Sequence, residues 1–223
     1  AHDMKGGLAA QLMAMKTIAE SGVKLKGDVI LACVSDEEYA SIGTEELVKK
    51  YKTDAAIVCE PTELNITVAH KGFAWTNIEI FGKAAHGSLP EKGIDAIVKA
   101  GKVLSELDHL ETKIFPKTQH PLLGRPSIHA SKINGGKEIS TYPDYCKLEI
   151  ERRTLPAENK ETVEQETHQL IERIKENDPD FHAKYNVHFY RPGLEVDKNE
   201  PIVQSLHRSY QSVTGKEPGY IRP

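Results

Sequence analysis

The stretch Cys146–Glu151, CKLEIE, alternates apolar and charged side chains. Its apolar members are Cys146, Leu148 and Ile150, and a charged residue follows each of them. Successive side chains of an extended chain point to opposite faces, so this period of two places all the apolar groups on one face. The stretch therefore predicts a β-strand with one face against a core and the other toward water.

The flanking sequence supplies the other elements of this domain. We expect strands at Phe73–Phe81, at Ser127–Ile133 and around Tyr185, Val187 and Phe189. Apolar residues at helical spacing predict two helices, marked by Ile94, Ile97, Leu104, Leu107 and Leu110 and by Val163, Leu170, Ile171 and Ile174. The order βαββαβ is that of the ferredoxin-like unit, in which two helices cover one sheet face. We expect residues 71–191 to form a separate small domain.

The first seventy residues follow a different pattern. Helices are predicted at Met4–Glu20 and Gly43–Tyr51, and continuously apolar strands at Asp28–Val34 and Asp54–Cys59. Strands that are apolar on both faces are typical of a parallel sheet with helices on both sides. We therefore expect an α/β fold in which residues 1–70 form part of one domain. Residues 192–223, with a helix at Pro201–Val213, would return to it, so that the small domain is an insertion.

Composition excludes several classes of protein. The chain has 223 residues, 39% of them hydrophobic and 28% charged, and a formal net charge of -4. Lys and Arg are scattered along it, so we expect no nucleic-acid partner. The longest apolar run, Val29–Val34, is too short to cross a bilayer, so no membrane association is predicted. Cys33, Cys59 and Cys146 form no C-x-x-C pair and are interpreted as buried free thiols of a cytoplasmic protein.

Acidic residues gather where the predicted strands end. Val34 is followed by Ser35-Asp36-Glu37-Glu38, Cys59 is followed by Glu60, and Asp3 precedes the first helix. Ligands of open α/β sheets bind outside the carboxyl ends of the strands, so these acids are predicted to share a crevice. Facing carboxylates need a positive charge between them, and a pair of divalent cations is the usual solution. Spacing alone leaves two alternatives open, an N-cap role for Asp3 and a solvated acidic loop.

An ordered set of motifs resembles the M20 metallopeptidase family, in its acetylornithine deacetylase and succinyl-diaminopimelate desuccinylase group. The motifs are Ala1–Gly7 (AHDMKGG), Ser35–Glu38 (SDEE) followed by Ser41–Thr44 (SIGT), and Glu60–Thr62 (EPT). The resemblance implies a zinc-peptidase-like catalytic domain with two divalent metal ions, zinc first and cobalt or manganese as alternatives. It also implies that Asp3 bridges the metals, that Glu38 and Glu60 each hold one, and that Glu37 is the general base.

The resemblance continues through the small domain, at Ala84–Pro90 (AAHGSLP), Gly135-Gly136, Tyr142–Cys146 and Arg153. It implies a lid that forms a homodimer, with His86 as a catalytic group at the oxyanion of the partner's site. Arg153 and Ser140 would bind substrate, although many members carry Asn where this chain has Ser140. From the residues alone, a histidine such as His86 is more often a loop residue before a helix, and Arg153 indicates only an exposed strand end.

The implied activity is metal-dependent hydrolysis of an amide bond in a small N-acyl amino acid. A dipeptidase or carboxypeptidase acting on a short peptide is the rival within the family, and a non-catalytic dimerisation fragment is the rival outside it. Family members run to nearly twice this length, and two histidine ligands are expected outside residues 1–223. We therefore expect this segment alone to be inactive.

Overall fold

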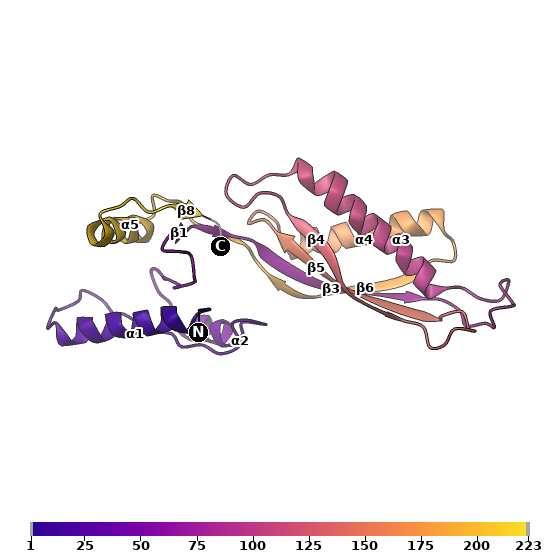
Figure 1. Cartoon of the computed structure of the whole chain (residues 1–223), viewed down its shortest axis with the longest axis horizontal. Coiled ribbons are helices and arrows are strands. Elements are labelled where there is room, and N and C mark those ends of the chain that lie inside the picture. Colours follow the sequence, from indigo (N-terminus) through magenta and orange to yellow (C-terminus); the bar gives the residue numbers. More distant parts are fainter. Residues whose placement is uncertain (1, 222–223) are drawn as a thin grey trace. The chain divides into compact units, whose positions relative to one another are not determined.

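A computed structural model describes residues 2–221 of the chain (Figure 1). The described residues divide into two compact units. Unit 1 comprises residues 2–67 and 197–221, and unit 2 comprises residues 68–196. No helix within residues 2–221 is long and apolar enough to span a membrane.

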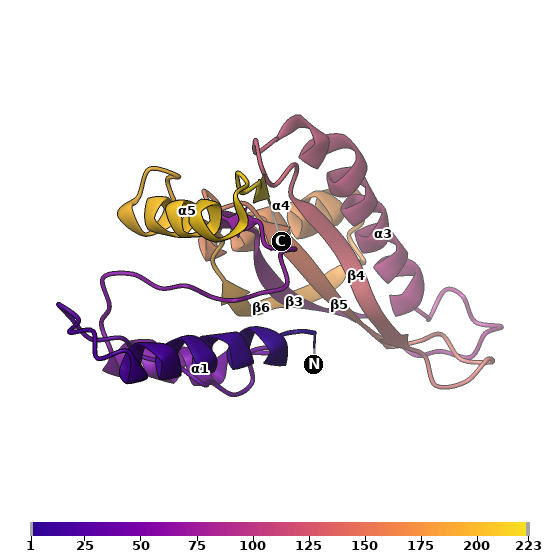
Figure 2. The same ribbon diagram turned by 60° about the vertical axis from the view of Figure 1, so that its left-hand side comes forward.

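Unit 2 is built around a four-stranded sheet. Its strands are β3 (Gly72–Phe81), β4 (Ser127–Gly135), β5 (Tyr145–Thr154) and β6 (His182–Arg191), in the order β4-β5-β3-β6. All neighbouring strands run antiparallel. Helices α3 (Ala96–His109) and α4 (Lys160–Asn177) lie on the same face of the sheet, as Figure 1 and Figure 2 show. This arrangement confirms the predicted ferredoxin-like unit.

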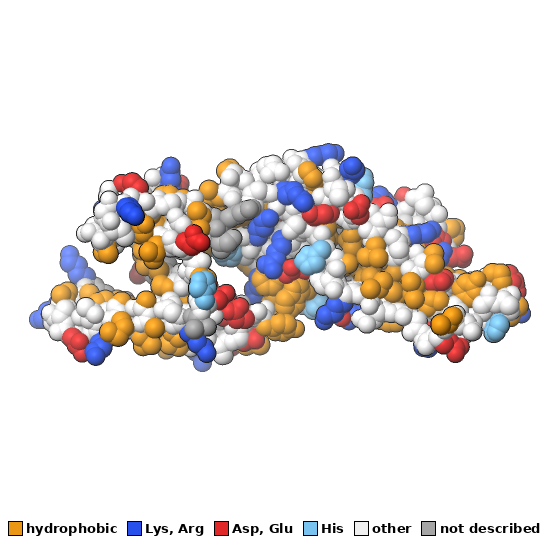
Figure 3. All heavy atoms as spheres, in the orientation of Figure 1, with side chains coloured by type: hydrophobic (Ala, Val, Ile, Leu, Met, Phe, Trp, Pro, Cys, Tyr) orange, Lys and Arg blue, Asp and Glu red, His pale blue; other side chains and the backbone are white. Residues whose placement is uncertain are grey.

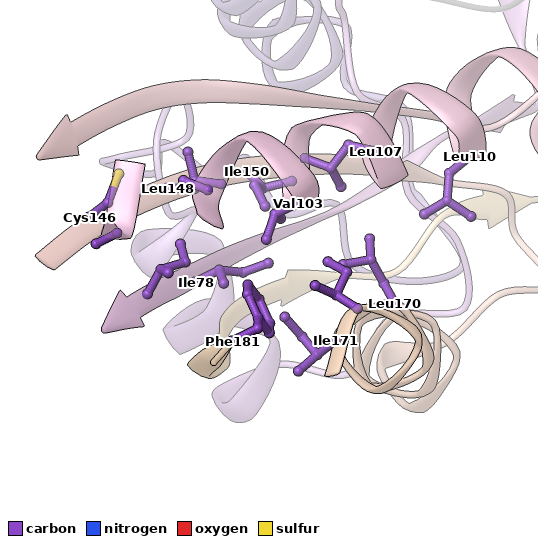
Figure 4. Packing of buried hydrophobic residues seen from close by; sticks show 14 of the residues in the cluster. Ile78, Val103, Leu107, Leu110, Cys146, Leu148, Ile150, Leu170, Ile171 and Phe181 are labelled. Atoms are coloured by element: carbon purple, nitrogen blue, oxygen red, sulfur yellow. The ribbon is translucent and has the colours of Figure 1, made fainter. Parts of the chain in front are cut away.

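The core of unit 2 lies between the sheet and the two helices (Figure 4). The apolar members of the alternating stretch, Cys146, Leu148 and Ile150, are all buried, as predicted. They pack with Ile78 of β3 and Phe181 before β6, and with helix residues that include Val103, Leu107, Leu170 and Ile171. Because the helices cover only one face, the period-two pattern of the strands fixes which side chains enter the core.

Side-chain caps fix where both helices begin. The Asp95 carboxylate accepts hydrogen bonds from the backbone N–H groups of Ile97 and Val98 at 2.9 Å. Asn159 and Thr162 form a capping box at the start of α4. These bonds satisfy N–H groups that have no partner within the helix. After α3 the chain continues as a π-helical turn, Leu110–Ile114, and a short 3-10 turn, Phe115–Lys117.

Two charged side chains of unit 2 are buried, those of Arg152 and Asp178. Arg152 is 1% exposed, and its guanidinium pairs with Glu158 at 2.6 Å and with Glu166 at 3.1 Å. It also lies over the Phe115 ring, 4.1 Å from the centroid. Burial raises the pKa of Glu166, against the attraction of Arg152.

A β-bulge in β6 departs from the predicted strand. The register shifts between Trp75 and Thr76, so that Trp75 pairs with Phe189 and Thr76 pairs with Val187. His188 is the extra residue. Val187 is buried, but Phe189 lies on the opposite face, because a bulge reverses the alternation of side chains beyond it.

A short ladder closes unit 2 where the chain enters and leaves it. Strands β2 (Ala69–His70) and β7 (Leu194–Glu195) pair antiparallel. The Val196 N–H also donates to the Val68 carbonyl at 2.8 Å.

Unit 1 contains helices α1 (Lys5–Glu20), α2 (Ile42–Lys50) and α5 (Pro201–Thr214), which confirm the three predicted helices to within a residue or two. Strands β1 (Ile66–Thr67) and β8 (Tyr220–Ile221) pair in parallel.

The prediction of strands at Asp28–Val34 and Asp54–Cys59 is wrong. Both segments are unpaired, and Val29, Ile30, Ile57 and Val58 are about half exposed or more. A strand exists only when a neighbour accepts its hydrogen bonds, and residues 2–221 supply none to these segments. Hydrophobic side chains consequently lie at the surface of unit 1, as Figure 3 shows over α1.

Candidate functional site

Four carboxylates of unit 1 form what we call the acid cluster: Asp3, Glu37, Glu38 and Glu60. Asp3 precedes α1, Glu37 and Glu38 lie in the turn before α2, and Glu60 follows the extended segment 54–59. Although the expected parallel strands are not paired, the segments that carry these acids still converge. The charges of Asp3 and Glu38 act on both Glu37 and Glu60, and Asp3 also forms a hydrogen bond with Glu60.

Ionisation is disfavoured at two members of the acid cluster, Glu37 and Glu60. Burial raises the pKa of Glu37, and the charges of Glu38 and Asp3 raise it further. Burial likewise raises the pKa of Glu60, with further contributions from Glu37, from a hydrogen bond and charge of Asp3, and from Glu38. Such mutual repulsion is relieved by a proton or by a cation. The cluster is therefore a site of concentrated negative potential.

Close backbone contacts bring the carrying segments together. A Cβ atom at Gly7 would collide with the carbonyl oxygen of Cys59, so only glycine allows α1 to lie this near the residue before Glu60. The Gln11 side chain adds a hydrogen bond to the Ile57 carbonyl at 3.4 Å.

The turn that carries Glu37 and Glu38 is fixed by its own hydrogen bonds. Asp36 and Ser41 have positive φ angles of 60° and 57°. The Ser41 N–H donates to the Asp36 carbonyl at 2.6 Å, and the Gly43 N–H donates to the Ser35 carbonyl at 3.1 Å. A Cβ at Gly43 would lie 2.6 Å from the backbone of Ser35, which explains the glycine that opens α2.

The acid cluster offers the right chemistry for a divalent ion but not a complete site. Carboxylate oxygens bind such ions, yet zinc usually takes three or four protein ligands in a tetrahedral arrangement. Within residues 2–221, no group of three or more His, Cys, Asp or Glu side chains is placed to hold a metal ion. Asp3, Glu38 and Glu60 are thus a partial set of oxygen ligands.

His86 lies in unit 2, on an exposed loop between β3 and α3. Its Nδ1 accepts a hydrogen bond from the Ser88 N–H at 3.2 Å and lies 2.8 Å from the Ser88 Oγ. Because Nδ1 is an acceptor, the proton of the neutral ring is assigned to Nε2. His86 can therefore donate one hydrogen bond from Nε2 to a ligand.

Ser140 lies beside His86. His86 forms an isolated β-bridge with Thr141, the Gly87 N–H donates to the Ser140 carbonyl at 2.8 Å, and the Tyr142 N–H donates to the Ala85 carbonyl at 2.8 Å. The structure therefore brings together two of the three residues that the sequence singled out in the small domain.

Arg153 lies at the other end of the sheet. It pairs with Phe73 at the start of β3, whereas the His86 loop follows Phe81 at the end of that strand. At about 3.3 Å per residue, the eight steps along the strand from Phe73 to Phe81 span roughly 26 Å. Arg153 forms an ion pair with Glu151 at 2.9 Å and lies 5.1 Å from the centroid of the Phe73 ring. A single small ligand cannot contact both Arg153 and His86 of one chain in this arrangement.

Sequence reasoning missed an aromatic group beside Arg153. Phe73, Trp75 and Phe189 contact one another on the sheet face that the helices leave uncovered. The alternation of Phe73 and Trp75 along one strand was a visible signal. The contribution of Phe189 was not, because it depends on the bulge.

Comparison with known proteins gives the family. The family described as the peptidase dimerisation domain, M20_dimer, matches residues 68–179. Acetylornithine deacetylase of Myxococcus xanthus is 29% identical over 210 residues, covering 92% of this chain and 54% of the relative. N-formyl-4-amino-5-aminomethyl-2-methylpyrimidine deformylase of Bacillus subtilis is 30% identical over 240 residues, covering 96% of this chain and 56% of the relative. The chain thus spans about half the length of these curated relatives.

A solved structure shows the same fold. The crystal structure of a tripeptidase from Staphylococcus aureus superimposes with a TM-score of 0.77 at 21% identity, covering 99% of this chain and 56% of that one. The matched residues 68–179 contain β3, α3, β4, β5 and α4 of the ferredoxin-like unit. On the family match and the shared fold, this chain belongs to the M20 peptidase family, whose dimerisation domain it carries in unit 2.

Proposed function

We propose that the protein to which this chain belongs hydrolyses an amide bond of a small N-acyl amino acid in a metal-dependent reaction. The observation that supports this most directly is the coupling of the four carboxylates in the acid cluster. The names of two relatives, a deacetylase and a deformylase, describe removal of an acyl group and support the same reaction class.

Asp3, Glu38 and Glu60 would hold two divalent ions, zinc in the first instance, with Asp3 between them. Such ions supply an acidified water and polarise the carbonyl that it attacks. Residues outside 1–223 would complete the ligand set.

Glu37 is proposed as the general base and not as a ligand. Its raised pKa places it nearer to neutrality than an ordinary carboxylate, which suits a group that takes a proton and later returns it to the departing amine. The Nε2–H of His86 would donate a hydrogen bond to the oxyanion as it forms. Ser140, which lies beside His86, and Arg153, at the other end of the sheet, are proposed as substrate contacts that come from different chains of a homodimer.

The same proposal includes a homodimer formed through unit 2. Strand β4 is an edge strand that pairs with β5 on one side, and its residues 129–135 are exposed. An exposed edge offers N–H and C=O groups to a second copy of the chain. The interpretation of all three cysteines as buried is wrong for two of them, because Cys33 is exposed and Cys59 is partly exposed, whereas Cys146 is buried. All three are free thiols, which supports a reducing compartment, and we propose the cytoplasm.

A peptidase acting on short peptides is the second candidate, because a structural neighbour is a tripeptidase. The deciding experiment measures metal content and turnover of the full-length protein on N-acetyl and N-succinyl amino acids and on di- and tripeptides. Turnover of acyl amino acids with two bound metals supports the first candidate, and turnover of peptides alone supports the second. A metal-free, inactive dimer would leave the non-catalytic role.

A further inference from the structure

The backbone around His86 is fixed by contacts that do not fix its ring. The Gly87 N–H donates to the Ser140 carbonyl at 2.8 Å, and His86 forms a β-bridge with Thr141. These bonds position the main chain of the loop. They leave rotation about the side-chain bonds of His86 free, so the direction of its two ring nitrogens depends on contacts of the ring itself.

Ser88 supplies the contacts of the ring. The His86 Nδ1 atom accepts a hydrogen bond from the Ser88 N–H at 3.2 Å and lies 2.8 Å from the Ser88 Oγ. Within residues 2–221, no other residue forms a hydrogen bond, ion pair or ring contact with the His86 side chain. The orientation of this exposed ring therefore depends on Ser88.

The chemistry of these two contacts determines where the ring proton lies. A backbone N–H can only donate, and it needs an unprotonated ring nitrogen to receive its bond, so Nδ1 carries no proton. The Ser88 hydroxyl then donates as well, and the two donors share the lone pair of Nδ1. The hydroxyl contact is the shorter of the two, 2.8 Å against 3.2 Å, and therefore the stronger one. The proton of the neutral ring lies on Nε2.

Donors beside Nδ1 give His86 a different capacity from that of a triad histidine. An acceptor beside Nδ1, such as the carboxylate of a catalytic triad, places the proton of the neutral ring on Nδ1 and leaves Nε2 to act as a base. The donors of Ser88 have the opposite effect, because they place the proton on Nε2. A ring in this tautomer can donate a hydrogen bond from Nε2, which is the contact that a developing oxyanion requires.

We propose that Ser88 is a positioning residue, whose hydroxyl and N–H group hold the His86 ring so that its Nε2–H donates to the oxyanion. The catalytic consequence rests on the proposed function, because it requires His86 to contact the oxyanion. The orientation of the ring does not rest on it and can be measured without turnover. Residues that orient a functional histidine through its second nitrogen typically contribute roughly ten- to a hundredfold to activity or affinity.

Nitrogen NMR of the 223-residue chain reports the tautomer of His86 directly. The chain is labelled at its histidine nitrogens and measured at about pH 8, where an ordinary histidine is neutral. His86→Asn identifies the signals of His86 by their loss. We expect its Nε2 to be protonated and its Nδ1 to be unprotonated. Ser88→Ala should shift the Nδ1 signal, whereas Ser88→Thr, which keeps the hydroxyl at an exposed position, should leave it nearly in place.

Two controls belong to the same spectra. His120 accepts two backbone N–H groups at its Nδ1, at 3.2 and 3.1 Å, so its signals should show the same tautomer and should not move in any Ser88 variant. Ser105→Ala, at an exposed serine of α3, should leave the His86 signals unchanged. A proton on Nδ1 of His86 in the unaltered chain, or an Nδ1 signal that Ser88→Ala does not move, would overturn the proposal.

Kinetics of the full-length protein test the consequence for catalysis. Ser88→Ala should lower kcat about ten- to a hundredfold with little change in KM, because the bond to the oxyanion forms only in the transition state. Ser88→Thr should recover most of this loss, and Ser105→Ala should leave kcat unchanged. Thermal melting checks that all three variants fold. Equal losses for Ser88→Ala and Ser88→Thr would count against the hydroxyl and overturn the proposal.

A double-mutant cycle separates positioning from any other role of Ser88. In a His86→Ala background, Ser88→Ala should have no further effect on kcat, because the ring that Ser88 orients is absent. A loss of the same size in both backgrounds would show that Ser88 acts elsewhere and would overturn the proposal.

The same variants distinguish a failure of this inference from a failure of the proposed function. An inactive His86→Ala protein together with a fully active Ser88→Ala protein would refute the positioning role alone. Full activity of His86→Ala would refute the role of His86 in the proposed function, and the NMR spectra would still decide whether Ser88 holds the ring.

Discussion

Glu37 differs in its expected role from the other members of the acid cluster. Burial and the charges of Glu38 and Asp3 raise its pKa, so it holds a proton to a higher pH than a solvated carboxylate would. In the full-length protein, Glu37→Gln should lower kcat by about two to four orders of magnitude, the usual contribution of a general base. Metal stoichiometry should stay the same, because no ligand is removed.

The control for this substitution is Glu46→Gln on α2, which removes an exposed carboxylate paired with Lys49. It should leave kcat unchanged. Steady-state kinetics and elemental analysis of both variants decide the matter. A Glu37→Gln protein that loses its metals would make Glu37 a ligand, and one that retains full activity would remove it from the reaction.

At the scale of elements, a buried aspartate forms ion pairs that join helices α3 and α4. Asp178, at the C-terminus of α4, bonds Lys99 at 2.6 Å and Lys102 at 2.8 Å, both from α3. Burial of Asp178 opposes its ionisation, but the hydrogen bonds from the two lysines outweigh that effect and lower its pKa to about 2. Asp178→Asn should therefore destabilise the chain by about 2 kcal/mol near neutral pH, the contribution of a charged hydrogen bond.

The pH dependence of this loss has a definite sign. A folded-state pKa below the ordinary value of 3.8 stabilises the fold above about pH 4, and the stabilisation disappears as pH falls toward 2. Urea unfolding of Asp178→Asn and of the unaltered chain should therefore converge at low pH. Asp180→Asn, at an exposed neighbouring position, should show no difference at any pH. A gap that persists at pH 2 would contradict an ionic origin.

Elements also show what the sequence could and could not predict. The period-two pattern was sufficient to predict strand β5, because β5 is a central strand of the sheet and only one of its faces is buried. The apolar segments 28–34 and 54–59 carried an equally strong signal, but strand formation depends on a neighbour and not on the segment itself. The bulge at His188 depends on register with β3 and has no local signature. The order of the motifs predicted which carboxylates form the acid cluster. The distance between Arg153 and His86 could not be predicted in this way, because it depends on how β3 pairs with β5.

At the scale of the whole molecule, dimerisation through β4 can be tested at Ile133. This edge-strand residue is 52% exposed. If a second copy of the chain covers the edge, Ile133→Lys should raise the dimer dissociation constant about tenfold or more, because it places a charge inside the interface. Val213→Lys on α5, where the residue is 86% exposed, is the matched control. Sedimentation equilibrium should show weaker association for the first variant only, and equal dissociation constants would exclude β4 from the interface.

The metal affinity of the 223-residue chain tests how complete its ligand set is. Asp3, Glu38 and Glu60 are the proposed ligands within it, and residues 2–221 contain no group of three or more side chains placed to hold a metal ion. Complete zinc sites bind in the nanomolar range or tighter, and they do so with three or four ligands for each ion. Calorimetric titration with zinc should therefore give dissociation constants weaker than about 10 μM and no amidase turnover.

The control is a triple variant, Asp3→Asn, Glu38→Gln and Glu60→Gln. In the triple variant, the heat of zinc binding to the acid cluster should disappear, whereas the heat of adventitious zinc binding to surface histidines should remain. Two tight sites with turnover in the unaltered chain would contradict the prediction, because the acid cluster would then need ligands that the present arrangement does not bring to it. Weak binding that the triple variant abolishes would instead identify these three carboxylates as the part of a two-metal site that this chain contributes.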